Sequence, residues 1–220
     1  MPAAGAALPD ASNLRERVVA TLRHTQPGQE PEFPYASSFT AEQVLMLRRA
    51  LPERLAQAAV LVPLVERPEG LHVLLTVRAS HLKHHAGQIS FPGGRVEPGD
   101  ISPWEAALRE AREEIGLEPG FVSPIGYLRD HLVISGFRVT PAVGFVQPGF
   151  TLQLDTTEVE DVFEVPLEFI IDPAHHVARE RHFAGLTVPT WEIPFQGRHI
   201  WGATASMLIS LSRRLQGTEP

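Results

Sequence analysis

Three glutamates within five residues carry the clearest chemical signal in the sequence. Glu110, Glu113 and Glu114 stand at i, i+3 and i+4, and in a helix this spacing places their carboxylates within a ~100° arc of one face. Like charges at these spacings each destabilise a helix by about 0.2–0.5 kcal/mol, and the helix dipole disfavours anions in the last turn. A divalent cation that prefers oxygen ligands, Mg²⁺ or Mn²⁺, would remove this repulsion. The alternative is a solvated acidic face.

The limits of the helix that carries these glutamates are well marked. Ser102 and Glu105 form the pattern of a capping box, and Pro103 falls at the first helical position, where its missing N–H has no cost. Gly116 stands where a helix is expected to end. We therefore predict a helix over residues 103–115. Its apolar residues share a second arc, so the acidic stripe is expected to be a surface separate from the core face, which comprises Trp104, Ala107, Leu108, Ala111 and Ile115.

A glycine-rich loop precedes this helix and completes a longer motif. Phe91-Pro-Gly-Gly94 is followed by Gly94-x5-Asp100 and then by Arg109-Glu-Ala-x-Glu-Glu-x-Gly-Leu117. This pattern resembles the Nudix box, Gly-x5-Glu-x7-Arg-Glu-aliphatic-x-Glu-Glu-x-Gly-aliphatic. The chain departs from the box in having Asp100 for the first Glu, and in having eight residues rather than seven between Asp100 and Arg109. The extra residue gives no support for a role of Asp100, but the second half of the box is intact.

The resemblance implies a catalytic centre. Glu110, Glu113 and Glu114 would bind the Mg²⁺ or Mn²⁺ ions that bridge a substrate diphosphate, and Arg109 would orient the carboxylates. Nudix enzymes often place a further carboxylate in a loop after the box, as a general base or an extra ligand. Glu158 and Glu160 are both available, and alignment with the motif favours Glu158. The general base is then Glu113, Glu158 or Glu160.

A second motif narrows the substrate. The segment Leu74-Leu-Thr-Val-Arg-Ala-x3-Lys83-x3-Gly87-x3-Phe-Pro-Gly-Gly94 resembles the extended motif of the coenzyme A pyrophosphatase branch of the family, which usually has Arg in place of Lys83. The stretches 158–167 and 200–205 resemble the same branch. The resemblance implies hydrolysis of the diphosphate bond of coenzyme A, and possibly of its derivatives, to 3′,5′-ADP and 4′-phosphopantetheine.

The charge distribution agrees with an anionic substrate. Although the net charge is −7, which argues against nucleic-acid binding, no Asp or Glu occurs between residues 71 and 96. The candidate substrate-binding residues of this stretch are Arg78, Lys83, Gly93, Gly94 and Arg95. The same stretch holds His81, His84 and His85, for which a zinc site is a weaker alternative because no ligand geometry is defined.

Two other functions stay open. One is a Nudix hydrolase of another nucleoside diphosphate compound, such as ADP-ribose, NADH or a dinucleoside polyphosphate. The other is a non-catalytic nucleotide sensor on a Nudix scaffold. A sensor would usually lose carboxylates of the box, whereas here Arg109 and the three glutamates are all present.

Length and composition favour one domain. The 220 residues are 43% hydrophobic and include no cysteine, which excludes a disulfide framework and Cys-ligated metals. With no signal peptide or membrane span recognised, we expect a cytoplasmic protein without a membrane or nucleic-acid partner; its oligomeric state is not indicated. We predict an N-terminal arm over residues 1–39 and a Nudix hydrolase domain over 40–216.

The expected fold is α+β, a Nudix-like α/β/α sandwich around a mixed sheet. Strands are predicted at 58–65, 71–78, 121–129, 136–146, 159–165, 176–183 and 186–195. Further helices are predicted at 13–24, after Thr40, after Pro166 and at 201–215.

Overall fold

The computed structural model describes residues 11–28, 31, 40–133, 135–183 and 186–218. Its helices are α1 (Ala11–Leu22), α2 (Ala41–Ala50), α3 (Pro103–Ile115), α4 (Leu167–Ile171) and α5 (Gly202–Leu215), with 3-10 turns at Pro119–Phe121 and Pro173–His175. Its strands are β1 (Ala56–Arg67), β2 (Gly70–Arg78), β3 (Ile89–Ser90), β4 (Gly93–Arg95), β5 (Val122–Tyr127), β6 (His131–Val133), β7 (Phe137–Val146), β8 (Val159–Pro166), β9 (Val177–Phe183), β10 (Leu186–Phe195) and β11 (Arg198–Trp201).

The central sheet is mixed, as predicted. Its strand order is β3-β2-β1-β7-β5, with β4 on β1, β6 on β7 and β8 on β2. The long central strands β1 and β7 run parallel, from Ala56 opposite Phe137 to Val65 opposite Val146. Every other pair in this sheet is antiparallel. Strands β1, β2 and β7 are nearly continuous apolar runs, because both of their faces are covered.

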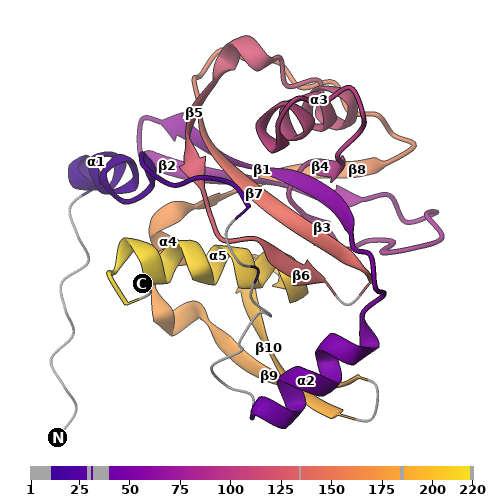
Figure 1. Ribbon diagram of the computed structural model, residues 1–220. Helices are drawn as coiled ribbons and strands as arrows, with labels where there is room; N and C mark the ends of the chain where they lie inside the picture. The colour runs from indigo at the N-terminus through magenta and orange to yellow at the C-terminus, as the bar shows by residue number, and fades with distance from the viewer. Residues whose placement is uncertain (1–10, 29–30, 32–39, 134, 184–185, 219–220) are drawn as a thin grey trace, which may run out of the picture.

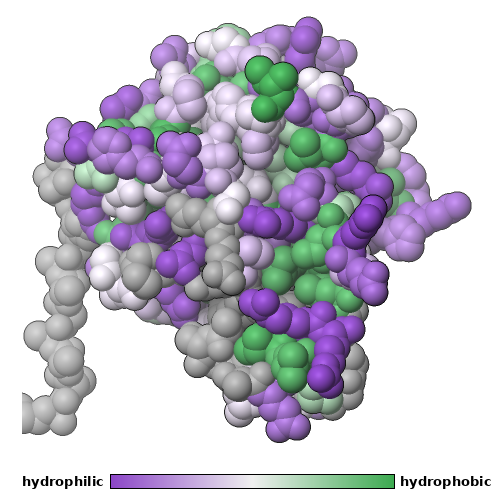
Figure 2. Space-filling view, viewed as in Figure 1, coloured by the Kyte–Doolittle hydropathy of each residue, from purple (hydrophilic) through white to green (hydrophobic). Residues whose placement is uncertain are grey.

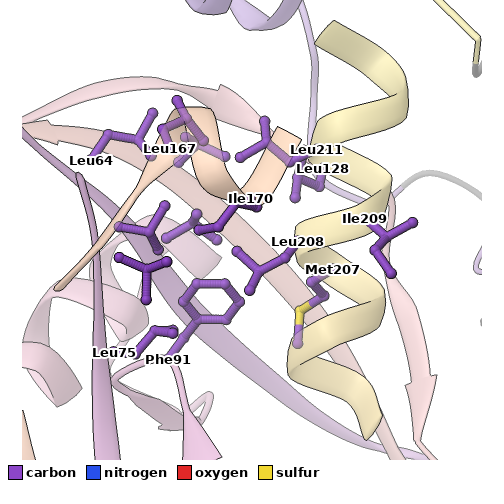
Figure 3. Packing of buried hydrophobic residues seen from close by; sticks show 14 of the residues in the cluster. Leu64, Leu75, Phe91, Leu128, Leu167, Ile170, Met207, Leu208, Ile209 and Leu211 are labelled. Carbon is purple, nitrogen blue, oxygen red and sulfur yellow. The ribbon is translucent and has the colours of Figure 1, made fainter. Parts of the chain in front are cut away.

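Helices cover both faces of this sheet (Figure 1), which confirms the layered α+β prediction. On one face α3 packs its alanines and Ile115 against Leu61 and Leu74. On the other face α4 and α5 bury a larger cluster, in which Leu75 and Phe91 meet Leu208 (Figure 3). The alternation of a strand sends its successive side chains to opposite layers, so Leu74 and Leu75 belong to different cores.

A second, three-stranded antiparallel sheet, β11-β10-β9, follows the central one. Strands β9 and β10 were predicted, whereas β11 was not. Gln196 and Gly197 have φ values of 47° and 78°, the backbone of a tight hairpin turn. The strand that follows has only four residues, too few to show an alternating pattern. Strands β4 and β6 are shorter still and were missed for the same reason.

The N-terminal helix changes the predicted domain boundary. Helix α1 buries Leu14, Val18 and Leu22 in the α5-side core, and the Arg17 guanidinium donates to the carbonyl of Leu215 at 2.7 Å. The arm predicted for residues 1–39 is therefore corrected for residues 11–22, which belong to the packed structure. Residues 1–10, 29–30 and 32–39 lie outside the described residues.

The surface holds few large apolar side chains among the described residues. Figure 2 shows hydrophobic surface over α2, where Leu45 is 49% and Met46 44% exposed. Within the described residues, no helix combines the length and the apolar character needed to cross a membrane.

Candidate active site

Helix α3 begins and ends as the sequence predicts. The Ser102 hydroxyl accepts a hydrogen bond from the Glu105 N–H at 3.2 Å, and Pro103 opens the first turn. Gly116 has a φ of 69° and caps the last turn through its N–H. A Cβ on Gly116 would lie 2.8 Å from the backbone nitrogen of Gln153, so both the conformation and the space require glycine.

The acidic stripe is not a separate surface, which corrects the prediction. Glu113 is 59% exposed, but Glu110 is 17% exposed and Glu114 only 4%. The cause lies in β4 beneath the helix. A Cβ on Gly94 would lie 2.5 Å from the Glu110 carboxyl carbon, so the missing side chain lets the carboxylate approach the sheet.

Glu114 is a buried carboxylate with incomplete charge compensation. Its Oε2 accepts a hydrogen bond from the Gly93 N–H at 3.0 Å, and its Oε1 lies 3.8 Å from Nη1 of Arg78. Burial raises the pKa of Glu114 to about 8; the nearby Glu110 and Glu158 add to this rise, and Gly93 and Arg78 oppose it. Burial and the same kind of repulsion also raise the pKa of Glu110. When both glutamates are ionised, Arg78 and Arg109 therefore supply too little positive charge to offset burial and repulsion.

This pKa makes the stability of the metal-free protein depend on pH. The pKa of Glu114 rises from 4.5 to about 8 on folding. Between pH 4.5 and 8, the folded state therefore keeps a proton on Glu114 that the unfolded state has released. The free energy of unfolding should then fall as pH rises from about 4.5 to 8, by a few kcal/mol, since one pKa unit corresponds to about 1.4 kcal/mol. Urea unfolding in EDTA at several pH values measures this, with Glu114→Gln as reference. An equal pH dependence in both proteins would contradict the assignment.

Arg109 is the hub of a network of acidic groups. Its Nε and Nη2 donate to the two Asp100 oxygens at 3.1 and 3.0 Å, and its Nη1 donates to Glu110 at 2.9 Å and Glu113 at 3.0 Å. Nη2 also donates to the carbonyl of Arg95 at 2.9 Å. The guanidinium thus fixes the Glu110 carboxylate and links α3 to β4. The pKa of Asp100 lies below its usual value, chiefly because of its hydrogen bond from Arg109.

Asp100 is the residue that the sequence reasoning missed. Its position as the first acid of the motif was the available signal, but the extra residue after it obscured this. The chain takes up that residue in an exposed bend, where Ile101 is 87% exposed. Asp100 stays in place because its Oδ2 accepts a hydrogen bond from the Glu97 N–H at 2.7 Å.

The loop after the box separates the two candidate carboxylates. The Glu160 carboxylate accepts a hydrogen bond from the Ser80 N–H at 3.0 Å. Glu158 is exposed, and its charge contributes to raising the pKa of both Glu110 and Glu114. Of the two candidates, Glu158 is therefore the carboxylate whose charge acts on Glu110 and Glu114.

Comparison with known proteins places this chain in a family. Residues 55–185 match the NUDIX domain family. The uncharacterized Nudix hydrolase NudL of Salmonella dublin is 38% identical over 187 residues, which cover 84% of this chain and 95% of that protein. NudL of Salmonella typhimurium gives the same figures. The chain belongs to the Nudix family. A solved structure of the C. elegans Ap4A hydrolase is 22% identical, with a TM-score of 0.44, over 50% of this chain and 80% of that one.

This Nudix hydrolase brings together only part of its predicted substrate-binding set. Gly93, Gly94 and Arg78 lie beside the glutamates. Lys83 is exposed in the turn between β2 and β3. The Arg95 guanidinium lies 5.2 Å from the centre of the Phe137 ring, and Phe137 packs on the α5 side of the sheet. Because Gly94 faces α3, strand alternation turns Arg95 away from the glutamates.

The donor set of this Nudix site fits a divalent cation in charge and chemistry. Glu110 and Glu114 are oxygen donors whose ionised forms are disfavoured by burial and by repulsion from neighbouring carboxylates, and a nearby cation would offset both effects. Among the described residues, no three Asp, Glu, His or Cys side chains are grouped as ligands in their present rotamers. Arg109 holds Glu113 instead, so a metal held by all three glutamates requires this exposed side chain to turn.

The histidines of the acid-free stretch 71–96 do not share a binding site among the described residues. His81 Nε2 lies 3.1 Å from the Thr157 carbonyl, and His85 Nδ1 lies 2.9 Å from the Gln88 side-chain oxygen. These separate partners, from different segments, give no support to the zinc alternative.

Proposed function

We propose that this Nudix hydrolase cleaves the diphosphate bond of coenzyme A, with Mg²⁺ or Mn²⁺, to 3′,5′-ADP and 4′-phosphopantetheine. The observation that carries the proposal is the position of Arg78. This residue lies within the coenzyme-A-like motif, 3.8 Å from Glu114, and its Nε is buried without a hydrogen-bond partner. A buried donor without an acceptor is costly. A substrate phosphate oxygen beside the glutamates would supply the acceptor.

The residues of the site would divide the work of hydrolysis. Glu110, Glu113 and Glu114 would hold the divalent ions, which when bound neutralise the diphosphate and lower the pKa of water. Arg109, held by Asp100, orients Glu110. Glu158 would take the proton of the attacking water, whose oxygen bonds to one phosphorus as the bridging P–O bond breaks. Arg78 would bind the diphosphate, and Lys83 the 3′-phosphate.

Dephospho-CoA, which lacks only the 3′-phosphate, tests the substrate. Losing a charge-assisted hydrogen bond costs roughly 1.5–3 kcal/mol, so kcat/KM should be about ten- to a hundredfold lower than for coenzyme A. Chromatography of the products from both compounds, and from NADH and ADP-ribose, measures this. Each reaction is run with Mg²⁺ or Mn²⁺ and again with excess EDTA, which should abolish turnover.

Two variants test whether Lys83 contacts the 3′-phosphate. Lys83→Ala should shrink the difference between coenzyme A and dephospho-CoA, whereas Arg112→Ala should not, because Arg112 is an exposed cation paired with Glu118. Equal kcat/KM values for the two compounds in the wild type would refute the 3′-phosphate assignment. Faster hydrolysis of NADH or ADP-ribose than of coenzyme A would favour the alternative Nudix substrates.

A further inference from the structure

The loop that carries Glu158 is attached to the end of helix α3. The Gln153 N–H donates to the carbonyl of Ile115, and the Asp155 N–H donates to the carbonyl of Glu114, each at 2.9 Å. The last carbonyls of a helix have no partner within the helix. The loop therefore supplies the donors for these carbonyls. Its position is fixed by these bonds relative to the helix that bears Glu110, Glu113 and Glu114.

Asp155 makes five hydrogen bonds, one to helix α3 and four to the residues that follow it. Besides its N–H bond to Glu114, its Oδ1 accepts from the Thr157 N–H at 2.9 Å and from the Thr157 hydroxyl at 2.6 Å. Its carbonyl accepts from the N–H groups of Glu158 at 3.0 Å and Val159 at 2.8 Å. The pKa of Asp155 is lowered chiefly by the Thr157 hydroxyl, so the bonds favour the ionised form.

The other side of the loop is attached to the end of β2. The Ala79 N–H donates to the carbonyl of Glu158 at 2.8 Å, and His81 Nε2 donates to the carbonyl of Thr157 at 3.1 Å. The Glu158 backbone is thus bonded at its N–H and at its carbonyl. Its side chain is exposed. The position from which this side chain extends is therefore fixed by the backbone hydrogen bonds.

We propose that Asp155 is a positioning residue that places the Glu158 carboxylate opposite Glu110 and Glu114. The Asp155 N–H bond to the carbonyl of Glu114 fixes the loop relative to α3. The side chain and carbonyl of Asp155 are hydrogen-bonded to the turn that ends in Glu158, so they fix that turn in the same position. This inference rests on the proposed function, in which Glu158 accepts the proton. A carboxylate displaced by about 1 Å loses on the order of a hundredfold in rate in sensitive cases. For an exposed side chain that can partly readjust, we expect roughly tenfold.

The first test compares three variants. Asp155→Ala should lower kcat roughly tenfold with little change in KM, and Asp155→Asn should restore most of it, because its amide oxygen can still accept from Thr157. Asp172→Ala is the matched control. Asp172 makes the same kind of turn, with its Oδ1 accepting from the Ala174 N–H at 2.9 Å, but it follows α4 on the opposite side of the sheet. Loss of kcat in the control equal to that in Asp155→Ala would overturn the proposal.

A double-mutant cycle separates positioning from general stability. In a Glu158→Gln background, Asp155→Ala should have almost no further effect on kcat, because the group it positions is already absent. Additive losses would overturn the proposal. Amide hydrogen exchange gives a readout independent of activity: the Thr157 amide should exchange faster in Asp155→Ala while the amides of α3 stay protected. Unchanged exchange at Thr157 would also contradict the proposal.

Two further choices keep the test decisive. If Asp155→Ala does not fold, Thr157→Val replaces it, since this change removes only the hydroxyl bond to Asp155, and the same cycle applies with a smaller loss. The kinetics use whichever of coenzyme A, NADH and ADP-ribose the wild type hydrolyses fastest. A wild type that prefers NADH or ADP-ribose would refute coenzyme A as substrate, whereas an additive cycle would refute only the role of Asp155.

Discussion

Glu114→Gln is expected to lower kcat/KM by about a thousandfold in saturating Mg²⁺. The substitution keeps the shape of the side chain and its acceptor for the Gly93 N–H, but removes the one buried charge of the acidic stripe. Metal-ion catalysis supplies several kcal/mol, and roughly 4 kcal/mol corresponds to a thousandfold in rate. Initial rates with the proposed substrate, coenzyme A, measure the effect.

The stability of the same variant should change in the opposite direction. Without metal at pH 8 and above, Glu114→Gln removes the cost of a buried carboxylate and should unfold at a higher temperature than the wild type. Millimolar Mn²⁺ should raise the melting temperature of the wild type through binding, and that of the variant by less. Glu118→Gln is the control, because Glu118 is 56% exposed and pairs with Arg112. Wild-type activity in Glu114→Gln, or equal metal-induced shifts of the melting temperature in both proteins, would show that Glu114 does not bind the catalytic metal.

Gly94→Ala is expected to lower kcat/KM by about a hundredfold or more. A Cβ at this position would lie 2.5 Å from the carboxyl carbon of Glu110, far closer than any real contact. The carboxylate must therefore rotate away from β4 and lose the geometry that Arg109 gives it. Misplacement of a catalytic group by about 1 Å costs on the order of a hundredfold. The same kinetic assay measures the loss.

The chain offers a close control for this change. Gly99 lies in the loop after β4, and a Cβ there would have no atom within 4 Å. Gly99→Ala should therefore keep near-wild-type activity. The melting temperature of Gly94→Ala should fall only slightly, because the clash is with the far end of a side chain. A large loss of stability in Gly94→Ala would show that the loop backbone matters rather than Glu110. A loss of activity in Gly99→Ala as large as that in Gly94→Ala would show the same.

The local features of the site could be predicted from the sequence because local interactions determine them. The capping pattern at Ser102, Pro103 at the first turn and Gly116 beyond the last fix the limits of α3, since a helix end depends on a few neighbouring residues. The apolar runs of β1, β2 and β7 likewise predict buried strands. The acidic residues of the motif and the Nudix family followed from spacing along one continuous segment.

The tertiary structure alone decided which of these residues meet and which are buried. Glu110 can approach the sheet because Gly94 of β4, from another segment, presents no side chain beneath α3, and the buried Glu114 carboxylate meets the Gly93 N–H of the same strand. Asp100 binds Arg109 because an exposed bend takes up the extra residue between them. Helix α1 joins the core through contacts with elements far along the chain. These outcomes depend on how distant segments pack, and neither burial nor pairing across such distances is encoded in the spacing of neighbouring residues.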